Sequence, residues 1–237
     1  MSLVSRRSVI KLSGGALLAL SAFPIIKKTI AKEDLLSWED FLQHCAELSN
    51  VQFGTDWDQD EYTLKIEKIL QKLHVQDGYI QRFVENYRDR NPYFPEIRAL
   101  HRESQFEISL IEFAEDELIP LHDHPDMTGV ILCVEGRVKV EHFDKLEEAS
   151  DNNRPLLQKE RSLVMTNGDS AILTATRGNI HSLHAEKFTR MIDVFTPPYN
   201  RDRVMRSRYY KLDDQPYQDR ADVYAAEVSR SPRFSTD

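Results

Sequence analysis

The sequence has few cysteines, no long apolar segment and a deficit of basic residues. Cys45 and Cys133 are its only cysteines among 237 residues, which excludes a disulfide scaffold and a cysteine-rich zinc site. No apolar run reaches the roughly 20 residues of a transmembrane helix, which excludes a polytopic membrane protein. Lys and Arg number 31 against 39 Asp and Glu. We therefore expect no nucleic-acid partner, because nucleic-acid binding needs a basic surface.

The first 32 residues contain no acidic side chain. Arg6 and Arg7 precede an apolar run, Leu12 to Ile26, and a Lys pair follows it. This layout is typical of an export signal, and the Arg pair resembles the twin-arginine signals of bacteria. We expect residues 1–31 to be such a signal peptide, which sends a folded protein to the periplasm and leaves no stable membrane span after processing. A short N-terminal anchor or a basic amphipathic start to the fold is the alternative.

The state of the two cysteines is open, because the periplasm is oxidising. Cys45 lies in a segment with a helical pattern and Cys133 in one with a strand pattern. Two buried free thiols are favoured over one long-range disulfide, since a buried cysteine behaves as a small hydrophobic residue.

Residues 32–92 have a helical pattern. Ser37 is expected to cap a first helix and Asp60 a second, and a third helix is expected at Tyr79–Tyr87. Pro92 and Pro95 end the helical portion, because proline does not fit inside a helix. The apolar face of the first helix is expected to consist of Trp38, Phe41, Leu42, Cys45 and Leu48.

The remaining chain has the pattern of short strands separated by turns. Many short strands with glycine turns indicate a β-sandwich or barrel. The polar stretch Glu147–Arg161 is expected to be a surface excursion, and residues 211–237 a charged C-terminal tail. The expected strands are Phe106–Phe113, Leu118–His124, Val130–Val134, Arg137–Phe143, Leu163–Met165, Ala171–Ala175, His181–Ala185 and Arg190–Phe195.

Three histidines in the strand region have the spacing of metal ligands. His122 and His124 are one residue apart, so on a strand both imidazoles project to the same face. His181 follows a glycine turn, and several strands separate it from the pair, enough for the chain to return to the same pocket. This pattern predicts a metal site. By contrast, His142 is expected at the surface, and His184 on the opposite face of its strand from His181.

These histidine segments resemble the two motif boxes of the cupin superfamily. In the first box His122, His124 and Gly136 match, but Gly129, or Thr128 with the shorter gap, stands where that superfamily has a metal-binding Glu. The second box matches with Thr176 in place of Pro. The resemblance implies a mainly β fold, a double-stranded β-helix (cupin) barrel with a small helical N-terminal portion. Without the carboxylate, a bound metal keeps its full charge and an open face, which suits a thiolate ligand.

Three segments are also similar to the plant cysteine oxidase and cysteamine dioxygenase family: Ile119–Thr128, Gly178–His181 and Asp193–Tyr199. The similarity extends from about residue 93 to residue 210. We therefore expect the cupin thiol dioxygenase domain to cover residues 93–210, after a helical N-terminal portion at residues 32–92.

This family resemblance implies an iron enzyme that inserts both atoms of O2 into a thiol to give a sulfinate. It implies that His122, His124 and His181 hold one Fe(II) per chain and that Asp193 and Tyr199 are catalytic. The expected substrate is an aminothiol, namely cysteamine, cysteine or the N-terminal cysteine of a peptide. We expect the protein to act as a monomer.

The roles of the catalytic candidates follow from their chemistry. Asp193 is expected to pair with a substrate ammonium or to orient a ligand histidine, and Tyr199 to donate a hydrogen bond to bound oxygen. Two positions depart from the family pattern: Asp126 replaces a Gly, and Ser207 replaces the Cys that precedes a tyrosine pair. A non-catalytic metal- or ligand-binding cupin of the cell envelope, and a different cupin oxygenase or isomerase, are the alternatives.

The export hypothesis predicts the effect of changing the arginine pair. Replacing Arg6 and Arg7 together by Lys should leave the precursor in the cytoplasm, because Lys does not reproduce the directed hydrogen bonds of a guanidinium. Cell fractionation and immunoblotting measure this. Normal export and processing of the double-Lys protein would contradict the twin-arginine assignment.

Overall fold

The computed structural model describes residues 35–52, 54–76, 78–85 and 95–232. All of them belong to a compact unit that spans Ala31–Asp237. The predicted signal peptide therefore lies outside the described residues. None of the helices in the described ranges is long and apolar enough to cross a membrane.

The described elements follow the expected order of helices first and strands second. The helices are α1 (Trp38–Ser49), α2 (Gln59–Leu70), α3 (Gly78–Glu85), α4 (Arg201–Arg206) and a 3-10 turn at Tyr217–Asp219. The strands are β1 (Glu96–Arg102), β2 (Glu107–Phe113), β3 (Leu118–His122), β4 (Thr128–Glu135), β5 (Arg137–Ala149), β6 (Pro155–Thr166), β7 (Ser170–Leu173), β8 (Ile180–Ala185), β9 (Thr189–Thr196), β10 (Tyr209–Leu212) and β11 (Val223–Ser229).

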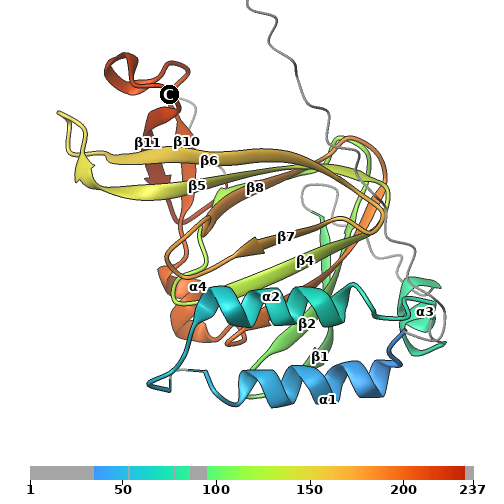
Figure 1. Cartoon of the computed structure of the whole chain (residues 1–237). Coiled ribbons are helices and arrows are strands. Elements are labelled where there is room, and N and C mark those ends of the chain that lie inside the picture. The colour runs from blue at the N-terminus through green and yellow to red at the C-terminus, as the bar shows by residue number, and fades with distance from the viewer. Residues whose placement is uncertain (1–34, 53, 77, 86–94, 233–237) are drawn as a thin grey trace, which may run out of the picture. The chain divides into compact units, whose positions relative to one another are not determined.

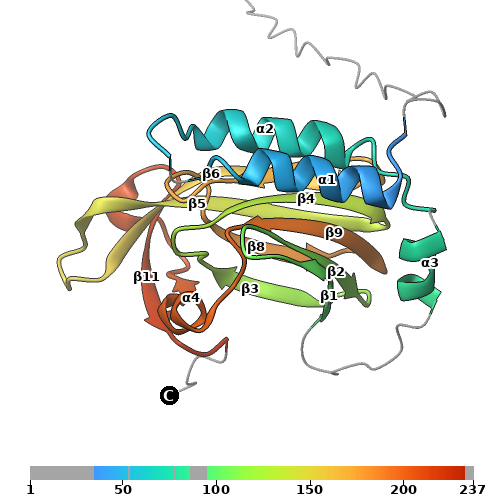
Figure 2. The same cartoon turned by 90° about the horizontal axis from the view of Figure 1, so that it is seen from below.

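The strands form two antiparallel sheets that face each other (Figures 1 and 2). One has five strands in the order β1-β2-β9-β4-β7, and the other closes on itself in the order β10-β11-β6-β5-β8-β3. Between β2 and β9 the chain crosses repeatedly from one sheet to the other. This winding is that of a double-stranded β-helix, so the predicted mainly β, cupin-type fold is confirmed.

Strand β9 shows how the two faces of the five-stranded sheet differ. Side chains alternate along a strand, and Ile192 and Val194 belong to the apolar cluster on the helical side. Met191 belongs to the cluster between the two sheets. Asp193 shares the face of Met191 and lines a cavity between the sheets. The register of one strand thus directs a carboxyl group into the interior of the barrel.

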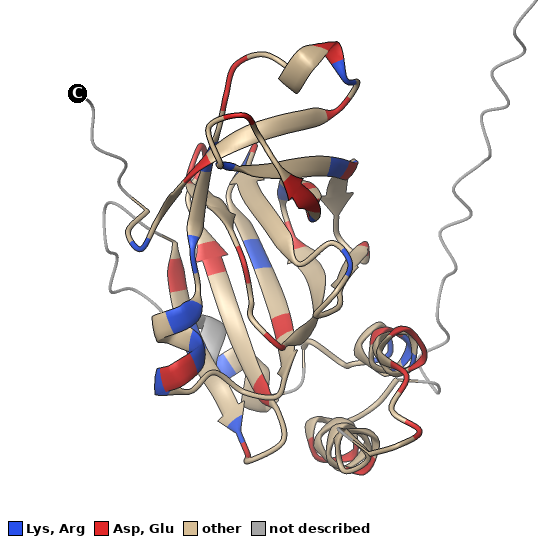
Figure 3. Cartoon of the chain, turned by 90° about the vertical axis from the view of Figure 1, so that its left-hand side faces the viewer, with Lys and Arg blue, Asp and Glu red and all other residues tan. Residues whose placement is uncertain are grey.

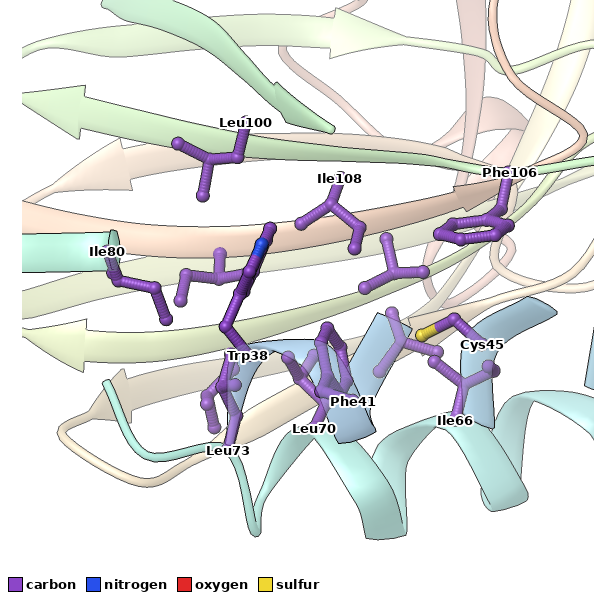
Figure 4. Close-up of a cluster of buried hydrophobic side chains, with 14 of the residues drawn as sticks. Trp38, Phe41, Cys45, Ile66, Leu70, Leu73, Ile80, Leu100, Phe106 and Ile108 are labelled. Atoms are coloured by element: carbon purple, nitrogen blue, oxygen red, sulfur yellow. The ribbon is translucent and has the colours of Figure 1, made fainter. Parts of the chain in front are cut away.

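Helices α1 and α2 cover the outer face of this sheet (Figures 1 and 3). Trp38, Phe41 and Cys45 of α1 pack with Ile66 of α2 against the sheet (Figure 4). In addition, the hydroxyl of Tyr62 on α2 lies 2.5 Å from the hydroxyl of Thr196, the last residue of β9. The helical portion therefore supports the back of the strand that carries Asp193.

One predicted helix cap is confirmed and the other is wrong. The Ser37 hydroxyl accepts a hydrogen bond from the Asp40 backbone N–H at 3.1 Å and caps α1. The cap of α2 is Asp58, whose carboxylate accepts from the Glu61 N–H at 3.0 Å, and not the predicted Asp60. Asp60 instead lies in the first turn, where an acidic side chain interacts favourably with the helix dipole.

The predicted surface excursion and the described part of the predicted tail both contain paired strands. Residues 147–161 contain the end of β5 and half of β6, which pair as a long hairpin. In the predicted tail, residues 211–237, β11 pairs with β6 and β10, and Val223, Ala225 and Ala226 are buried. Both segments are rich in charge because one face of each strand is exposed, so composition alone hid their pairing. Strand β1 was also absent from the expected strands.

The predicted turn at Glu135–Gly136 joins β4 and β5 and requires glycine. Gly136 has a φ of +94°, and a Cβ atom there would lie 2.1 Å from the Phe188 carbonyl oxygen. Any other residue would clash with the backbone.

Both cysteines are buried free thiols, as predicted. Burial raises the pKa of Cys133 to about 11 and also raises that of Cys45. A thiol with a raised pKa stays protonated near neutral pH and reacts slowly.

Candidate metal centre

The three predicted metal ligands come together from two neighbouring strands and one loop. His122 ends β3, His124 lies in the loop that follows, and His181 lies on β8. β3 and β8 pair with His122 directly opposite His181. One nitrogen from each ring lies within 4.8 Å of those of the other two. Two segments far apart in the sequence therefore present three imidazoles to one point.

Hydrogen bonds on the outer side of the rings fix which nitrogen faces that point. The Nδ1–H of His122 donates to the Pro120 carbonyl at 2.8 Å. The Nδ1 of His124 is hydrogen bonded to the Tyr199 hydroxyl. The Nε2 atoms of His124 and His181 lie 3.3 Å apart. This is close to the separation of about 3 Å expected for two nitrogens that bind one metal about 2.1 Å away at right angles.

The fourth histidine nearby supports the ring of His181 from behind. His142 lies opposite His181 in the register of β5 and β8, and the two rings are 5.7 Å apart. The Nδ1–H of His142 donates to the Gly178 carbonyl at 2.9 Å, so its Nε2 is an acceptor. That atom and Nδ1 of His181 are buried without a hydrogen-bond partner in the described part of the chain. His142 is 1% exposed, so its predicted surface position is wrong.

The electrostatics of the triad favour neutral imidazoles. Burial lowers the pKa of His122. Burial and the neighbouring histidines lower the pKa values of His124 and His181 well below the usual range. Neutral imidazole is the form that binds metals. Three convergent ring nitrogens, two of them on rings held by outer hydrogen bonds, fit a metal ion with three nitrogen ligands.

Asn179 joins the two histidine segments. Its Oδ1 accepts from the His124 backbone N–H at 2.8 Å, and its Nδ2 donates to the His124 carbonyl at 3.0 Å. The same amide donates to the Thr174 carbonyl at 2.9 Å. One side chain thus holds both sides of the His124 peptide backbone and fixes the loop against the start of β8.

Asp123, between the two ligands of the first segment, holds the C-terminal part of the barrel. Its carboxylate accepts from the Arg208 N–H at 2.7 Å and from the Tyr210 hydroxyl at 2.7 Å. Its own N–H donates to the Arg208 carbonyl. These contacts hold β10 beside the loop that carries His124. Ser207 and Tyr209 therefore lie in the lining of the cavity between the two sheets.

The three histidines lie at the wall of a cavity of about 380 Å³ that also contains both predicted catalytic residues, Asp193 and Tyr199. Asp193 is 4% exposed. Burial and the nearby Glu107 raise the pKa of Asp193 well above its usual range, and the Val194 backbone offsets this in part. A carboxyl in this state gains strongly from a cationic partner, because the charge attraction is large in a dry pocket.

Tyr199 lies on the loop after β9 and contacts a metal ligand. Its ring packs 5.3 Å from that of Phe195, and its hydroxyl meets Nδ1 of His124. When Nε2 of His124 faces the metal, its Nδ1 carries the proton and donates to the Tyr199 oxygen. Burial raises the pKa of Tyr199 well above its usual range, so the hydroxyl keeps its own proton.

Glu107 and Arg102 hold the Tyr199 backbone at the edge of the cavity. Arg102 donates through Nη2 to the Tyr199 carbonyl, and its Nη1 lies 3.4 Å from Glu107 Oε2, an ionic contact without hydrogen-bond geometry. Burial raises the pKa of Glu107, while Arg102 and the Tyr199 backbone lower it in part. Glu107 is thus a second carboxyl group with a raised pKa in the cavity, and it lies close enough to Asp193 to raise the pKa of that residue as well.

Comparison with known families gives a match over residues 66–233 to the family model PCO_ADO. The chain belongs to the PCO_ADO family. The match includes all three histidines, Asp193 and Tyr199.

Individual relatives of this PCO_ADO member are distant. The 2-aminoethanethiol dioxygenase of Homo sapiens is 25% identical over 173 residues, 62% of this chain and 64% of that protein. Plant cysteine oxidase 2 of Arabidopsis thaliana is 26% identical over 118 residues, 48% of this chain and 42% of that protein. The chain thus spans less than two thirds of either relative. Among solved structures, a cupin superfamily protein from Desulfitobacterium hafniense is 16% identical with a TM-score of 0.35, over 46% of this chain and 83% of that one.

Several residues in and around the site had no role in the sequence analysis. Asn179 stands inside the Gly-Asn-Ile-His segment, so its position was a usable signal. Glu107 and Arg102 carry no such signal, because their proximity to Tyr199 arises from the pairing of β2 with β9. Arg177, inside the second box, pairs with Asp60 and Glu160 and is absent from the cavity lining.

The contacts of Asn179 predict its effect on metal binding. Asn179→Ala should weaken Fe(II) or Co(II) binding about 10- to 100-fold, the range for residues that orient ligands. Asn179→Asp should lose less affinity, because it keeps the acceptor for the His124 N–H. Anaerobic competition titration measures these affinities, and Asn152→Ala, an exposed turn position, serves as the control. Unchanged affinity in Asn179→Ala would remove Asn179 from this role.

The raised pKa of Asp193 predicts a pH-dependent stability change in the metal-free protein. The unfolded state, with a pKa near 3.8, loses its proton at lower pH than the folded state, so ionisation favours unfolding as pH rises. Asp193→Asn removes this effect and should raise the free energy of unfolding by an amount that grows as the pH rises above about 4 and levels off once the pH passes the folded-state pKa, at about 1.4 kcal/mol per pKa unit. Urea unfolding at several pH values measures it.

The control for this experiment is Asp214→Asn at an exposed position, where no such gain is expected. A loss of stability in Asp193→Asn that is constant with pH would show that Asp193 is not held protonated by its surroundings.

Proposed function

We propose that the protein is an Fe(II)-dependent thiol dioxygenase that converts an aminothiol and O2 into a sulfinate. The observation that carries the proposal is a three-histidine centre whose cavity also holds a buried carboxyl, Asp193. Membership of the PCO_ADO family and relatives named as thiol dioxygenases support it. Bound Fe(II) would supply adjacent positions for the thiolate and O2 and the electrons that O2 activation requires.

The ligand set supports a thiol as the substrate class. His122, His124 and His181 are neutral ligands, and Gly129 stands where cupins commonly have a carboxylate ligand. The site therefore keeps the positive charge that stabilises a thiolate. Ile119, Ile131, Leu183 and Phe195 add an apolar lining that excludes water and strengthens this attraction.

Asp193 and Glu107 give the cavity a preference for substrates that carry an ammonium group. Both line the cavity, and both have pKa values raised by burial. Glu107 has an ionic contact with Arg102, so a substrate ammonium would chiefly offer a counter-charge to Asp193 and bind as that carboxyl ionises. Arg230 lines the cavity too, but it is exposed at the rim.

Tyr199 holds a proton at its hydroxyl next to the centre. The hydroxyl accepts from Nδ1–H of His124 and can donate its own proton into the cavity, in line with the predicted hydrogen bond to bound oxygen. The same contact orients the His124 ring, so Tyr199 serves both positioning and catalysis.

We further propose that this reaction takes place in the periplasm. The Arg6–Arg7 pair and the apolar run after it support export of the folded protein. Such export allows metal to be inserted in the cytoplasm before transport.

Oxygen consumption with a panel of thiols tests the proposed reaction. Iron-loaded protein should consume one O2 per thiol with cysteamine and with a peptide that begins with cysteine, and act more slowly on 3-mercaptopropionate, which has no amine. Asp193→Asn should raise KM for the aminothiols about tenfold and affect 3-mercaptopropionate less. His181→Ala should lose both iron and turnover, while His184→Ala, an exposed position, keeps them.

Two outcomes would contradict the proposal. Absence of thiol-dependent oxygen consumption by iron-loaded protein would favour a non-catalytic metal-binding cupin. Equal damage to all thiols in Asp193→Asn would remove the ammonium-pairing role and leave Asp193 as a support for the metal ligands.

A further inference from the structure

The cavity in front of the three histidines is larger than a small aminothiol requires. Its volume is about 380 Å³, within the range of about 300–1,000 Å³ for pockets that enclose drug-sized ligands. Cysteamine has only four non-hydrogen atoms. A substrate with its sulfur at the histidines and its amine at Asp193 leaves the outer part of the cavity for a further group.

Two apolar side chains line that outer part. Ile97 on β1 and Val204 on α4 both belong to the cavity lining, and they are 52% and 60% exposed. They come from separate regions of the fold, the edge strand of the five-stranded sheet and the short helix after β9 (Figure 2). Exposed apolar side chains at the rim of a concave site are typical of a binding surface.

Ile97 and Val204, called the rim below, continue the apolar interior of the cavity. Ile97 lies opposite Ile111 in the register of β1 and β2, and Ile111 is a buried part of the same lining. One cavity lining therefore includes the metal ligands, the carboxyl groups of Asp193 and Glu107, and the exposed apolar side chains of Ile97 and Val204. This set of groups suits a molecule with a thiol, an amine close to it and an apolar group a few bonds further on.

We infer that the cavity selects peptides with an N-terminal cysteine followed by a large apolar residue. The inference rests on the proposed function and specifies its substrate. The thiol and α-ammonium of the first residue occupy the inner part, and the side chain of the second residue covers Ile97 and Val204. Cysteamine has no group that reaches the rim. Binding removes the second side chain and the apolar rim from contact with water. The kcat/KM for a peptide with Leu as its second residue should therefore be about tenfold higher than for a peptide with Gly there.

The test compares Cys-Leu-Gly-Gly, Cys-Gly-Gly-Gly and cysteamine on the iron-loaded full chain. The ratio of kcat/KM for the Leu peptide to that for the Gly peptide should be about 10 in the wild type. It should fall to about 3 in Ile97→Ser or Val204→Ser and to about 1 in the double variant. Val164→Ser, an exposed apolar position outside the cavity lining, should keep the wild-type ratio.

A binding measurement on the metal-free protein makes the test independent of turnover. Peptides with Ser in place of the first Cys should show the same order in calorimetry, with Ser-Leu-Gly-Gly bound more tightly than Ser-Gly-Gly-Gly. Because this comparison needs no iron, it can also be made on a rim variant that binds iron poorly.

The outcomes separate the two proposals. If neither cysteamine nor any peptide drives oxygen consumption, the proposed function fails. If cysteamine and the Gly peptide are oxidised but the Leu peptide is no better, or if the preference survives in the double variant, the inference about the rim is wrong. Loss of the preference in Val164→Ser would also contradict it, because that position is outside the cavity lining.

Discussion

The convergence of three imidazoles inside the barrel is the constraint around which the barrel interior is organised. The Nε2 atoms of His124 and His181 lie 3.3 Å apart, and desolvation lowers the pKa values of all three rings, so that they stay neutral. Neutral imidazoles whose nitrogens converge are the form that a metal ion binds. The surrounding contacts, from Pro120, Tyr199 and Asn179, orient the rings for that ion rather than for one another.

The second feature of the site is a buried carboxyl group, which gains from a cationic partner. Asp193 is a carboxyl buried on a strand whose other face packs against two helices. Tyr62 and the apolar cluster behind β9 hold that strand, so the carboxyl cannot move outwards to water. The helical N-terminal portion therefore contributes to function although it supplies no ligand. It keeps a buried carboxyl in the cavity that the three histidines line, the arrangement on which the proposed preference for an aminothiol rests.

Much of this was predictable because the metal ligands lie in short local motifs. The His-x-His spacing indicated two convergent rings without any knowledge of the fold, although His124 lies in the loop after β3 and not on the predicted strand Leu118–His124. The helix cap at Ser37 is equally local. The roles of Glu107, Arg102 and His142 were not predictable, because each depends on which strands become neighbours. The C-terminal strands β10 and β11 were missed for a related reason. Their exposed faces are charged. Their place in the fold depends on the contact with Asp123 and on the pairing with β6, and neither can be read from the local sequence.

The most direct test of the central claim is the origin of the oxygen atoms in the product. Iron-loaded protein is supplied with ¹⁸O2 and a peptide that begins with cysteine, and the product is analysed by mass spectrometry. A thiol dioxygenase places the label at both oxygen atoms of the sulfinate, and the proposed function predicts this result. A product with one labelled oxygen, a disulfide, or unchanged peptide would contradict it.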